Sequence, residues 1–138
     1  VWLGTNYRQL LEAAGGPVGE PEKYISGGPM MGFAMYSLDV PVVKGSSSLL
    51  VFKEDVVSKL ETSACIRCGR CVDVCPGRII PSDLAKYAEH GNIDAFLKHD
   101  GMECCECGCC SYICPAKRPL TQMIKSMRKM VLASRKKK

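Results

Sequence analysis

The sequence predicts an α+β protein whose two parts differ sharply in composition, with a boundary after Phe52. Residues 1–52 combine one helical stretch with short runs of branched apolar residues, as in a small mixed domain. Residues 53–138 hold all ten cysteines and several stretches with helical periodicity. A cysteine-rich domain of this size depends on bound metal for much of its stability. We therefore expect two domains, 1–52 and 53–138, the second mainly helical.

The first part is expected to begin with a helix over residues 6–14, capped by Thr5 and ended by Gly15. The segment GGPMMG, Gly27–Gly32, lacks the lysine and Ser/Thr of a P-loop and the spacing of a dinucleotide-binding loop. A tight turn over packed methionines is therefore favoured over a phosphate site. Short strands are expected at Tyr24–Ile25, Val40–Val43 and Ser48–Phe52.

Two copies of one cysteine pattern organise the second part of the chain. Each reads Cys-x2-Cys-x2-Cys-x3-Cys-Pro, first as CIRCGRCVDVCP and then as CCECGCCSYICP. Bacterial ferredoxins bind [4Fe–4S] clusters with this run, and its fourth cysteine ligates the other cluster. The pattern predicts cluster one on Cys65, Cys68, Cys71 and Cys114. It predicts cluster two on Cys104, Cys107, Cys110 and Cys75.

Structural zinc sites are the main alternative, but zinc requires neither a third cysteine at fixed short spacing nor the following proline. A disulfide framework is disfavoured, because cluster thiolates belong to a reducing compartment. The remaining cysteines, Cys105 and Cys109, overlay on Ile66 and Arg70 of the first copy. Neither counterpart can ligate iron, so apolar packing is favoured over a substitute ligand or a redox-labile thiol.

Four helices are expected around the two cysteine runs. The last one is amphipathic and follows Pro119, with basic residues on its other faces. His90 and His99 fall near helix ends, where a cation is favourable, and are not expected to be ligands. Arg135–Lys138 are expected to be disordered. The other three helices cover Lys53–Glu61, the stretch from a Ser82 cap to Gly91, and the stretch from Asn92 to Gly101.

The net charge of +5 is unevenly distributed, since nine of the nineteen lysines and arginines follow Ala116 with no acidic residue among them. A basic end suits lipid headgroups, an acidic protein or nucleic acid. It lacks interleaved aromatic residues for base stacking, which disfavours nucleic acid. No run is long enough for a membrane span, and no signal peptide is present, so a soluble chain or a peripheral subunit is expected. Because Val1 is not a start methionine, we expect the chain to begin inside a longer protein.

Several of these motifs together resemble the C subunit of the Rnf electron-transport complex over nearly the whole chain. They are GGPMMG, the segment PVVKGSSSLLVF at Pro41–Phe52, the first cysteine run, and CGCCSYICPAKRPL at Cys107–Leu120. The resemblance implies a membrane-bound complex that passes electrons between ferredoxin and NAD⁺ and couples this transfer to ion transport. It implies that residues 1–52 are the later part of a β-grasp, SLBB-like domain. FMN and NAD would bind an upstream domain absent from this chain, and Cys105 replaces the family's usual aliphatic residue.

The expected function is therefore electron transfer by a peripheral subunit on the cytoplasmic side of the cell membrane. The chain belongs to an oxidoreductase but contains no catalytic site of its own. Other subunits of the complex are the expected partners, with ferredoxin and anionic lipid as further candidates and no nucleic acid. The alternatives are a dicluster module of a soluble flavoprotein dehydrogenase and a metal-stabilised nucleic-acid-binding module. Cluster one is expected to have the higher potential, because Arg67, Arg70 and Arg78 lie near it whereas Glu103 and Glu106 lie near cluster two.

Overall fold

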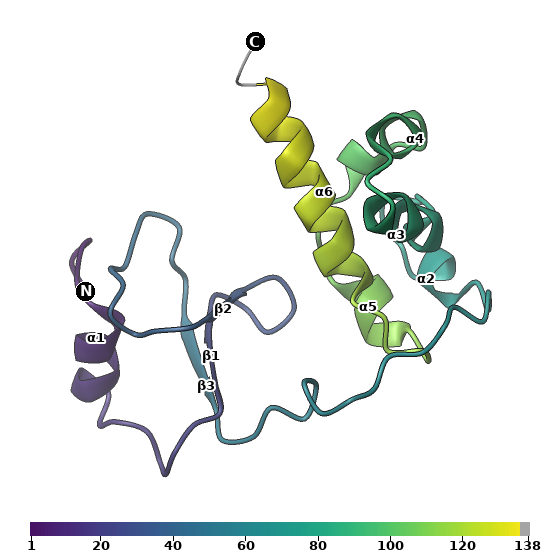
Figure 1. The fold of residues 1–138 in the computed structure, drawn as a ribbon. Coiled ribbons are helices and arrows are strands. Elements are labelled where there is room, and N and C mark those ends of the chain that lie inside the picture. Colours follow the sequence, from purple (N-terminus) through teal and green to yellow (C-terminus); the bar gives the residue numbers. More distant parts are fainter. Residues whose placement is uncertain (136–138) are drawn as a thin grey trace. The chain divides into compact units, whose positions relative to one another are not determined.

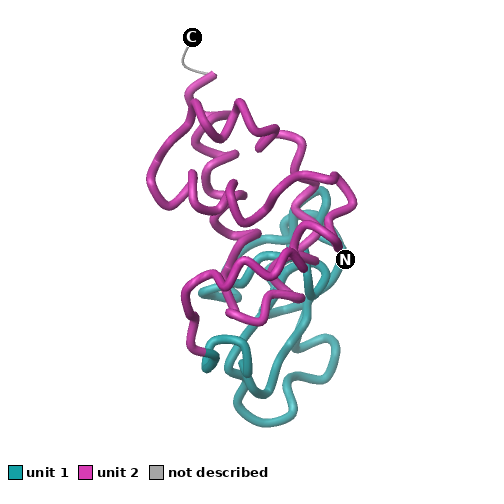
Figure 2. Tube along the Cα trace, turned by 90° about the vertical axis from the view of Figure 1, so that its right-hand side faces the viewer, with its two compact units in different colours: residues 1–60 teal, residues 61–138 magenta. Residues whose placement is uncertain are grey.

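The computed structural model describes residues 1–135, which form two compact units (Figure 2). The first unit comprises residues 1–60, and the second comprises the described residues from Glu61 onward. The boundary between them falls after Leu60, in an irregular segment that follows the last strand.

The first unit is a three-stranded antiparallel sheet with one helix, in the order β2-β1-β3 (Figure 1). The sheet pairs Tyr24 of β1 with Met35 of β2 on one side and with Val51 of β3 on the other. The Tyr7 and Ser26 hydroxyl oxygens lie 2.6 Å apart in a hydrogen bond that ties helix to sheet. The elements are α1 (Tyr7–Ala13), β1 (Lys23–Ser26), β2 (Phe33–Met35) and β3 (Leu49–Phe52).

Two predictions for this unit are wrong in detail. The cap of α1 is Asn6 rather than Thr5: the Asn6 side chain accepts from the Arg8 amide at 2.8 Å, and the Gln9 side chain accepts from the Asn6 amide. The strand expected at Val40–Val43 is an irregular segment with one bridge, between Asn6 and Pro41. Proline has no amide hydrogen to donate, so it interrupts a ladder at this point.

The GGPMMG segment connects β1 to β2 as the turn of a hairpin, and β2 itself was not predicted. A Cβ atom at Gly32 would lie 2.5 Å from the Gly28 carbonyl oxygen and 2.6 Å from the Ile25 side chain, so only glycine fits. Met30 and Met31 are about half exposed, and the expectation that they pack beneath the turn is wrong. Glycine is therefore needed in this turn because two stretches of backbone pass close to each other there.

The helix expected at Lys53–Glu61 does not form, and these residues make only turns. Val56, Val57 and Leu60 are exposed there, between 41% and 70%. A short helix is stable only when it can bury an apolar face, and these apolar side chains stay exposed.

The second unit is helical, with α3 packed along α6 (Figure 1). Its core combines Leu84 of α3 and Phe96 of α4 with Ile124, Met127 and Val131 of α6, which confirms the amphipathic stripe predicted for the last helix. No helix in residues 1–135 is both long and apolar enough to cross a membrane. The elements are α2 (Arg70–Asp73), α3 (Pro81–Glu89), α4 (Ile93–Lys98), the 3-10 helix η1 (Gly101–Glu103), α5 (Cys109–Ile113) and α6 (Leu120–Arg135).

The ends of these helices follow the predictions in part. Asn92 caps α4 by accepting from the Ala95 amide at 3.0 Å, and His90 and His99 are the C-cap residues of α3 and α4, as expected. Ser82 does not cap α3, because Pro81 occupies the first turn and Ile80 takes the cap position. Arg135 is helical rather than disordered, whereas the rest of the predicted disordered tail lies outside the described residues.

Candidate iron–sulfur centres

The backbone of the second unit repeats itself when Cys104 is overlaid on Cys65. Left-handed residues recur as Arg67 (φ 54°) and Glu106 (φ 57°), and as Arg78 (φ 50°) and Lys117 (φ 53°). The short helices α2 and α5 begin at equivalent positions, and so do the longer helices α3 and α6. Equivalent hydrogen bonds close the turn after each cysteine run, from the Arg78 amide to the Cys75 carbonyl and from the Lys117 amide to the Cys114 carbonyl. The duplicated sequence therefore folds into a duplicated structure.

This recurrence has an energetic cost that indicates a shared purpose. A non-glycine residue in the left-handed region costs about 1–2 kcal/mol, and such residues cluster at functional sites where the surroundings hold them in place. Gly69 and Gly108 adopt the same conformation between the second and third cysteines, at φ 78° and 84°. The Cys-x2-Cys-x2-Cys segment thereby curls tightly in both copies and turns its sulfur atoms toward a common space.

The first such space is a cavity of about 610 Å³ lined by Cys65, Cys68, Cys71 and Cys114. Three of these cysteines come from the first copy and one from the second. Cys65 and Cys68 are exposed, so this cavity opens to solvent along the first loop.

The second space is much narrower, about 20 Å³, and is lined by Cys75, Cys104, Cys107 and Cys110 together with Cys105. Again three of the predicted ligands come from one copy and the fourth from the other. Apolar residues complete the wall, among them Ile79, Pro81 and Ile124. Cys110 is only 8% exposed, and this cavity is closed where the first is open.

The cysteine donors of both cavities, rather than the volume of the second one, fit the chemistry of a four-iron cluster. Each offers four soft thiolate donors, in the crossed combination predicted from the spacing of the cysteines. A single zinc ion would hold four sulfurs at about 2.3 Å from the metal, which leaves no open space among them. In residues 1–135 no group of three or more Cys, His, Asp or Glu side chains is drawn together around one ion. The larger cavity in particular suits a cofactor bulkier than one metal ion.

The charges near the first cavity are mixed. Arg67, Lys86 and Arg118 line it together with Asp83 and Glu89. Arg118 forms an ion pair with Glu89, which raises the pKa of the Arg118 guanidinium. Spacing alone did not identify Lys86 or Arg118, because both come from segments remote in sequence from the first cysteine run.

In the second cavity, hydrogen bonds to the cysteine sulfur atoms offset the unfavourable effect of burial on negative charge. Burial raises the pKa of the Cys104 and Cys110 thiols. The Glu106 amide donates to the Cys104 sulfur at 3.4 Å, and the Thr121 hydroxyl lies 3.3 Å from the Cys110 sulfur. Such bonds stabilise negative charge on sulfur. The repeat could have pointed to Thr121, because its equivalent in the first copy is Ser82, a second hydroxyl beside a cysteine cavity.

Glu106 was expected to place negative charge near cluster two. In the structure its carboxylate is paired with Arg128 and lies 3.5 Å from the Lys125 ammonium. The charge of Glu106 is therefore largely compensated, and the expected difference between the two centres depends more on burial than on this residue. Of the two extra cysteines, Cys105 is exposed, while Cys109 is half-buried at the start of α5 and lines neither cavity.

Comparisons with known proteins agree with this site. The family model described as a 4Fe-4S dicluster domain matches residues 64–117. The chain is 42% identical, over 98% of its length, to the C subunit of the Na⁺-translocating ferredoxin:NAD⁺ oxidoreductase complex of Acetobacterium woodii. It is 46% identical, over 91% of its length, to the C subunit of the ion-translocating oxidoreductase complex of Methanosarcina acetivorans.

The alignments cover only 30% and 28% of these two relatives, so the chain corresponds to less than a third of their length. Its duplicated cysteine runs, their matching backbones and the similarity along nearly the whole chain all point the same way. The chain carries a 4Fe-4S dicluster domain and belongs to the family of C subunits of ion-translocating oxidoreductase (Rnf) complexes.

Proposed function

We propose that this chain is the electron-transfer part of the C subunit of a membrane-associated Rnf complex. It carries single electrons between ferredoxin and a site for NAD and flavin that lies outside residues 1–138. When bound, two [4Fe–4S] clusters supply the one-electron chemistry, and the chain contributes no acid, base or nucleophile. The relatives, which are named as subunits of ferredoxin:NAD⁺ oxidoreductase complexes, support this assignment.

The observation that carries the proposal is the division of eight cysteines between two cavities. Cys65, Cys68, Cys71 and Cys114 would hold cluster one, and Cys75, Cys104, Cys107 and Cys110 would hold cluster two. Each set borrows one cysteine from the other copy, and α2 contacts α5. The two sites are therefore built into one folded body, which keeps them close enough for electron exchange.

The remaining features of the proposal concern the context of the chain. The sheet and helix of the first unit support its assignment, over residues 1–52, to the later part of an SLBB-like β-grasp domain. We place the chain peripherally on the cytoplasmic face of the membrane, with other subunits of the complex as partners. Contact with anionic lipid would involve the basic C-terminal segment, in which Lys125 and Arg128 pair with Glu106 and Arg118 pairs with Glu89.

The test is anaerobic reconstitution followed by iron and sulfide quantitation and by EPR of the dithionite-reduced protein. Two clusters require about eight irons per chain and [4Fe–4S] signals that interact magnetically. Zinc in place of iron, with no EPR signal after reconstitution, would overturn the proposal.

A further inference from the structure

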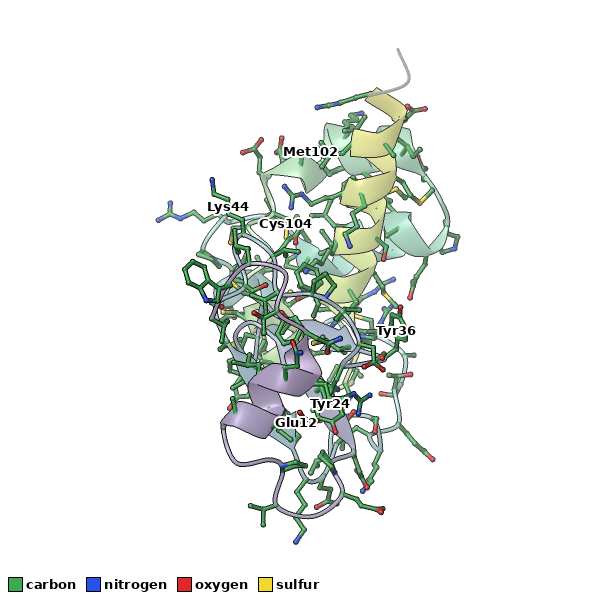
Figure 3. All side chains as sticks on the ribbon, turned by 90° about the vertical axis from the view of Figure 1, so that its left-hand side faces the viewer. Glu12, Tyr24, Tyr36, Lys44, Met102 and Cys104 are labelled. Atoms are coloured by element: carbon green, nitrogen blue, oxygen red, sulfur yellow. The ribbon has the colours of Figure 1, made fainter. Side chains whose placement is uncertain are left out.

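Arg128, on α6, contacts the chain on both sides of Cys104. Its guanidinium pairs with the Glu106 carboxylate and donates from Nη2 to the Met102 carbonyl at 3.2 Å. Figure 3 shows the labelled Met102 and Cys104 beside this helix. The Arg128 side chain is 21% exposed, and its Nε atom is buried without a hydrogen-bond partner among the described residues. A long cationic side chain is thus largely buried at the point where the second cysteine run begins.

The residue that Arg128 holds is in a strained conformation. Glu106 is left-handed, at φ 57°, and this conformation directs its amide to the Cys104 sulfur at 3.4 Å. This conformation costs free energy at any residue other than glycine. A charge-assisted hydrogen bond to a guanidinium offsets part of that cost and helps to hold the loop in place.

We propose that Arg128 is a positioning residue for cluster two. Its guanidinium bonds both the Glu106 side chain and the Met102 carbonyl, which lie on either side of Cys104, and so clamps the Cys104–Cys107 loop. The Glu106 amide thereby remains directed at the Cys104 sulfur. Arg128 also places a cation at the start of the second cysteine run, next to a cavity that has no charged residue in its lining. Both effects stabilise the more negative reduced state, so Arg128 raises the potential of cluster two. This inference rests on the proposed ligation of cluster two by Cys75, Cys104, Cys107 and Cys110.

The first copy of the repeat explains why such a clamp is needed at only one centre. Glu106 overlays on Arg67 and Arg128 overlays on Glu89, so the same two positions carry opposite charges. Glu89 pairs with Arg118, and its pair with Arg67 is not made in residues 1–135. Water reaches the first cavity and can itself solvate added negative charge, whereas the closed second cavity depends on groups supplied by the protein.

The test compares Arg128→Gln, Arg128→Lys and the control Arg135→Gln in the reconstituted 138-residue chain. Arg135 lies on the same face of α6, seven residues or about 10.5 Å further along, so its replacement removes the same charge from the same helix. Each variant is analysed for iron and titrated with EPR detection. A Cys65→Ser preparation, which is expected to retain cluster two alone, assigns the two signals.

We expect Arg128→Gln to move the cluster-two signal to lower potential while cluster one stays in place and Arg135→Gln leaves both unchanged. Arg128→Lys should move it in the same direction, because an ammonium keeps the charge but cannot bond Glu106 and Met102 together in a planar geometry. Selective loss of the cluster-two irons in Arg128→Gln would also support the clamp. If Arg128→Gln binds neither cluster, the cluster-two potential of Arg128→Lys tests the inference instead. A lower potential supports the inference, and a wild-type potential contradicts it.

Two results would overturn the inference. Unchanged potentials and iron content in Arg128→Gln would show that Arg128 has no influence on the centre. A wild-type potential in Arg128→Lys beside a shifted Arg128→Gln would show that charge alone acts, without positioning. Failure of the wild-type chain to bind about eight irons would instead overturn the proposed function, so the two failures can be told apart.

Discussion

The two cysteine cavities share a backbone and a donor set but differ in almost everything around them. The first is open, with Cys65 and Cys68 exposed and charged side chains at its wall. The second is narrow, with a largely apolar wall, a hydrogen bond from the Glu106 amide to the Cys104 sulfur and another between the Thr121 hydroxyl and the Cys110 sulfur. Because the ligands and their conformations repeat, any difference in potential must come from solvent, charge and hydrogen bonding. The molecule thus contains its own internal control for how surroundings tune a cluster.

The largest expected effect tests whether the two sites really share their cysteines. Cys114→Ser should remove cluster one, although Cys114 belongs to the second run, and should leave about four of about eight irons. Its EPR spectrum should match that of Cys65→Ser. Cys109→Ser, which changes a thiol outside both cavities, should retain all the iron. A Cys114→Ser spectrum that matched Cys107→Ser instead would show that each run ligates its own cluster.

The segments that precede the two cysteine runs should differ in how strongly an alanine substitution changes the free energy of unfolding. A Cβ atom at Gly101 would lie 2.4–2.5 Å from the ring of Phe96, which is fully buried and cannot move aside. We expect Gly101→Ala to lower the free energy of unfolding by about 1–3 kcal/mol, as overpacked cores do.

The equivalent residue in the first copy is the exposed Thr62, and Thr62→Ala should change the free energy of unfolding by less than about 0.5 kcal/mol. Chemical denaturation of both variants measures the difference. Equal effects would show that the approach to the first run is as firmly packed as the approach to the second.

The order of the potentials follows from the same contrast. Water stabilises the reduced state at the first cavity, whose lining has three cationic side chains against two carboxylates. Burial opposes added negative charge in the second cavity, so cluster one should be reduced at the higher potential. A redox titration with EPR detection, assigned with the Cys65→Ser protein, measures the order. Reduction of cluster two first would contradict it and would mean that its hydrogen bonds outweigh its burial.

The smallest expected effect concerns a pair of equivalent hydroxyl residues. The Thr121 hydroxyl is hydrogen-bonded to the Cys110 sulfur at 3.3 Å, whereas Ser82 lines the open cavity. Thr121→Val should lower the cluster-two potential by about 20–60 mV, the equivalent of one net hydrogen bond in a one-electron step. Ser82→Ala should leave the cluster-one potential nearly unchanged, and a shift of equal size there would remove the distinction between the two environments.

Cysteine spacing predicts two crossed ligand sets, because the short runs restrict the loop locally and the fourth cysteine must turn away. The linings of the two cavities divide the eight cysteines in the same way. The stripe on α6 was predictable for a similar reason, since helical periodicity is local. The prediction failed where the packing or ion-pair partner of a residue is distant in sequence. Val56, Val57 and Leu60 have helical spacing but stay exposed, and the Glu106–Arg128 pair joins a loop to a helix that begins well after it.

The proposed sharing of cysteines between the copies would have a consequence for symmetry. A single copy would contain three ligands for one site and one for the other, so it could complete neither as a monomer. Two identical copies related by a two-fold axis would complete both sites, in the manner of an isologous dimer. Joining the copies in one chain removes the requirement that they be identical, and the inverted charges at Arg67 and Glu106, and at Glu89 and Arg128, are differences that no such homodimer could have.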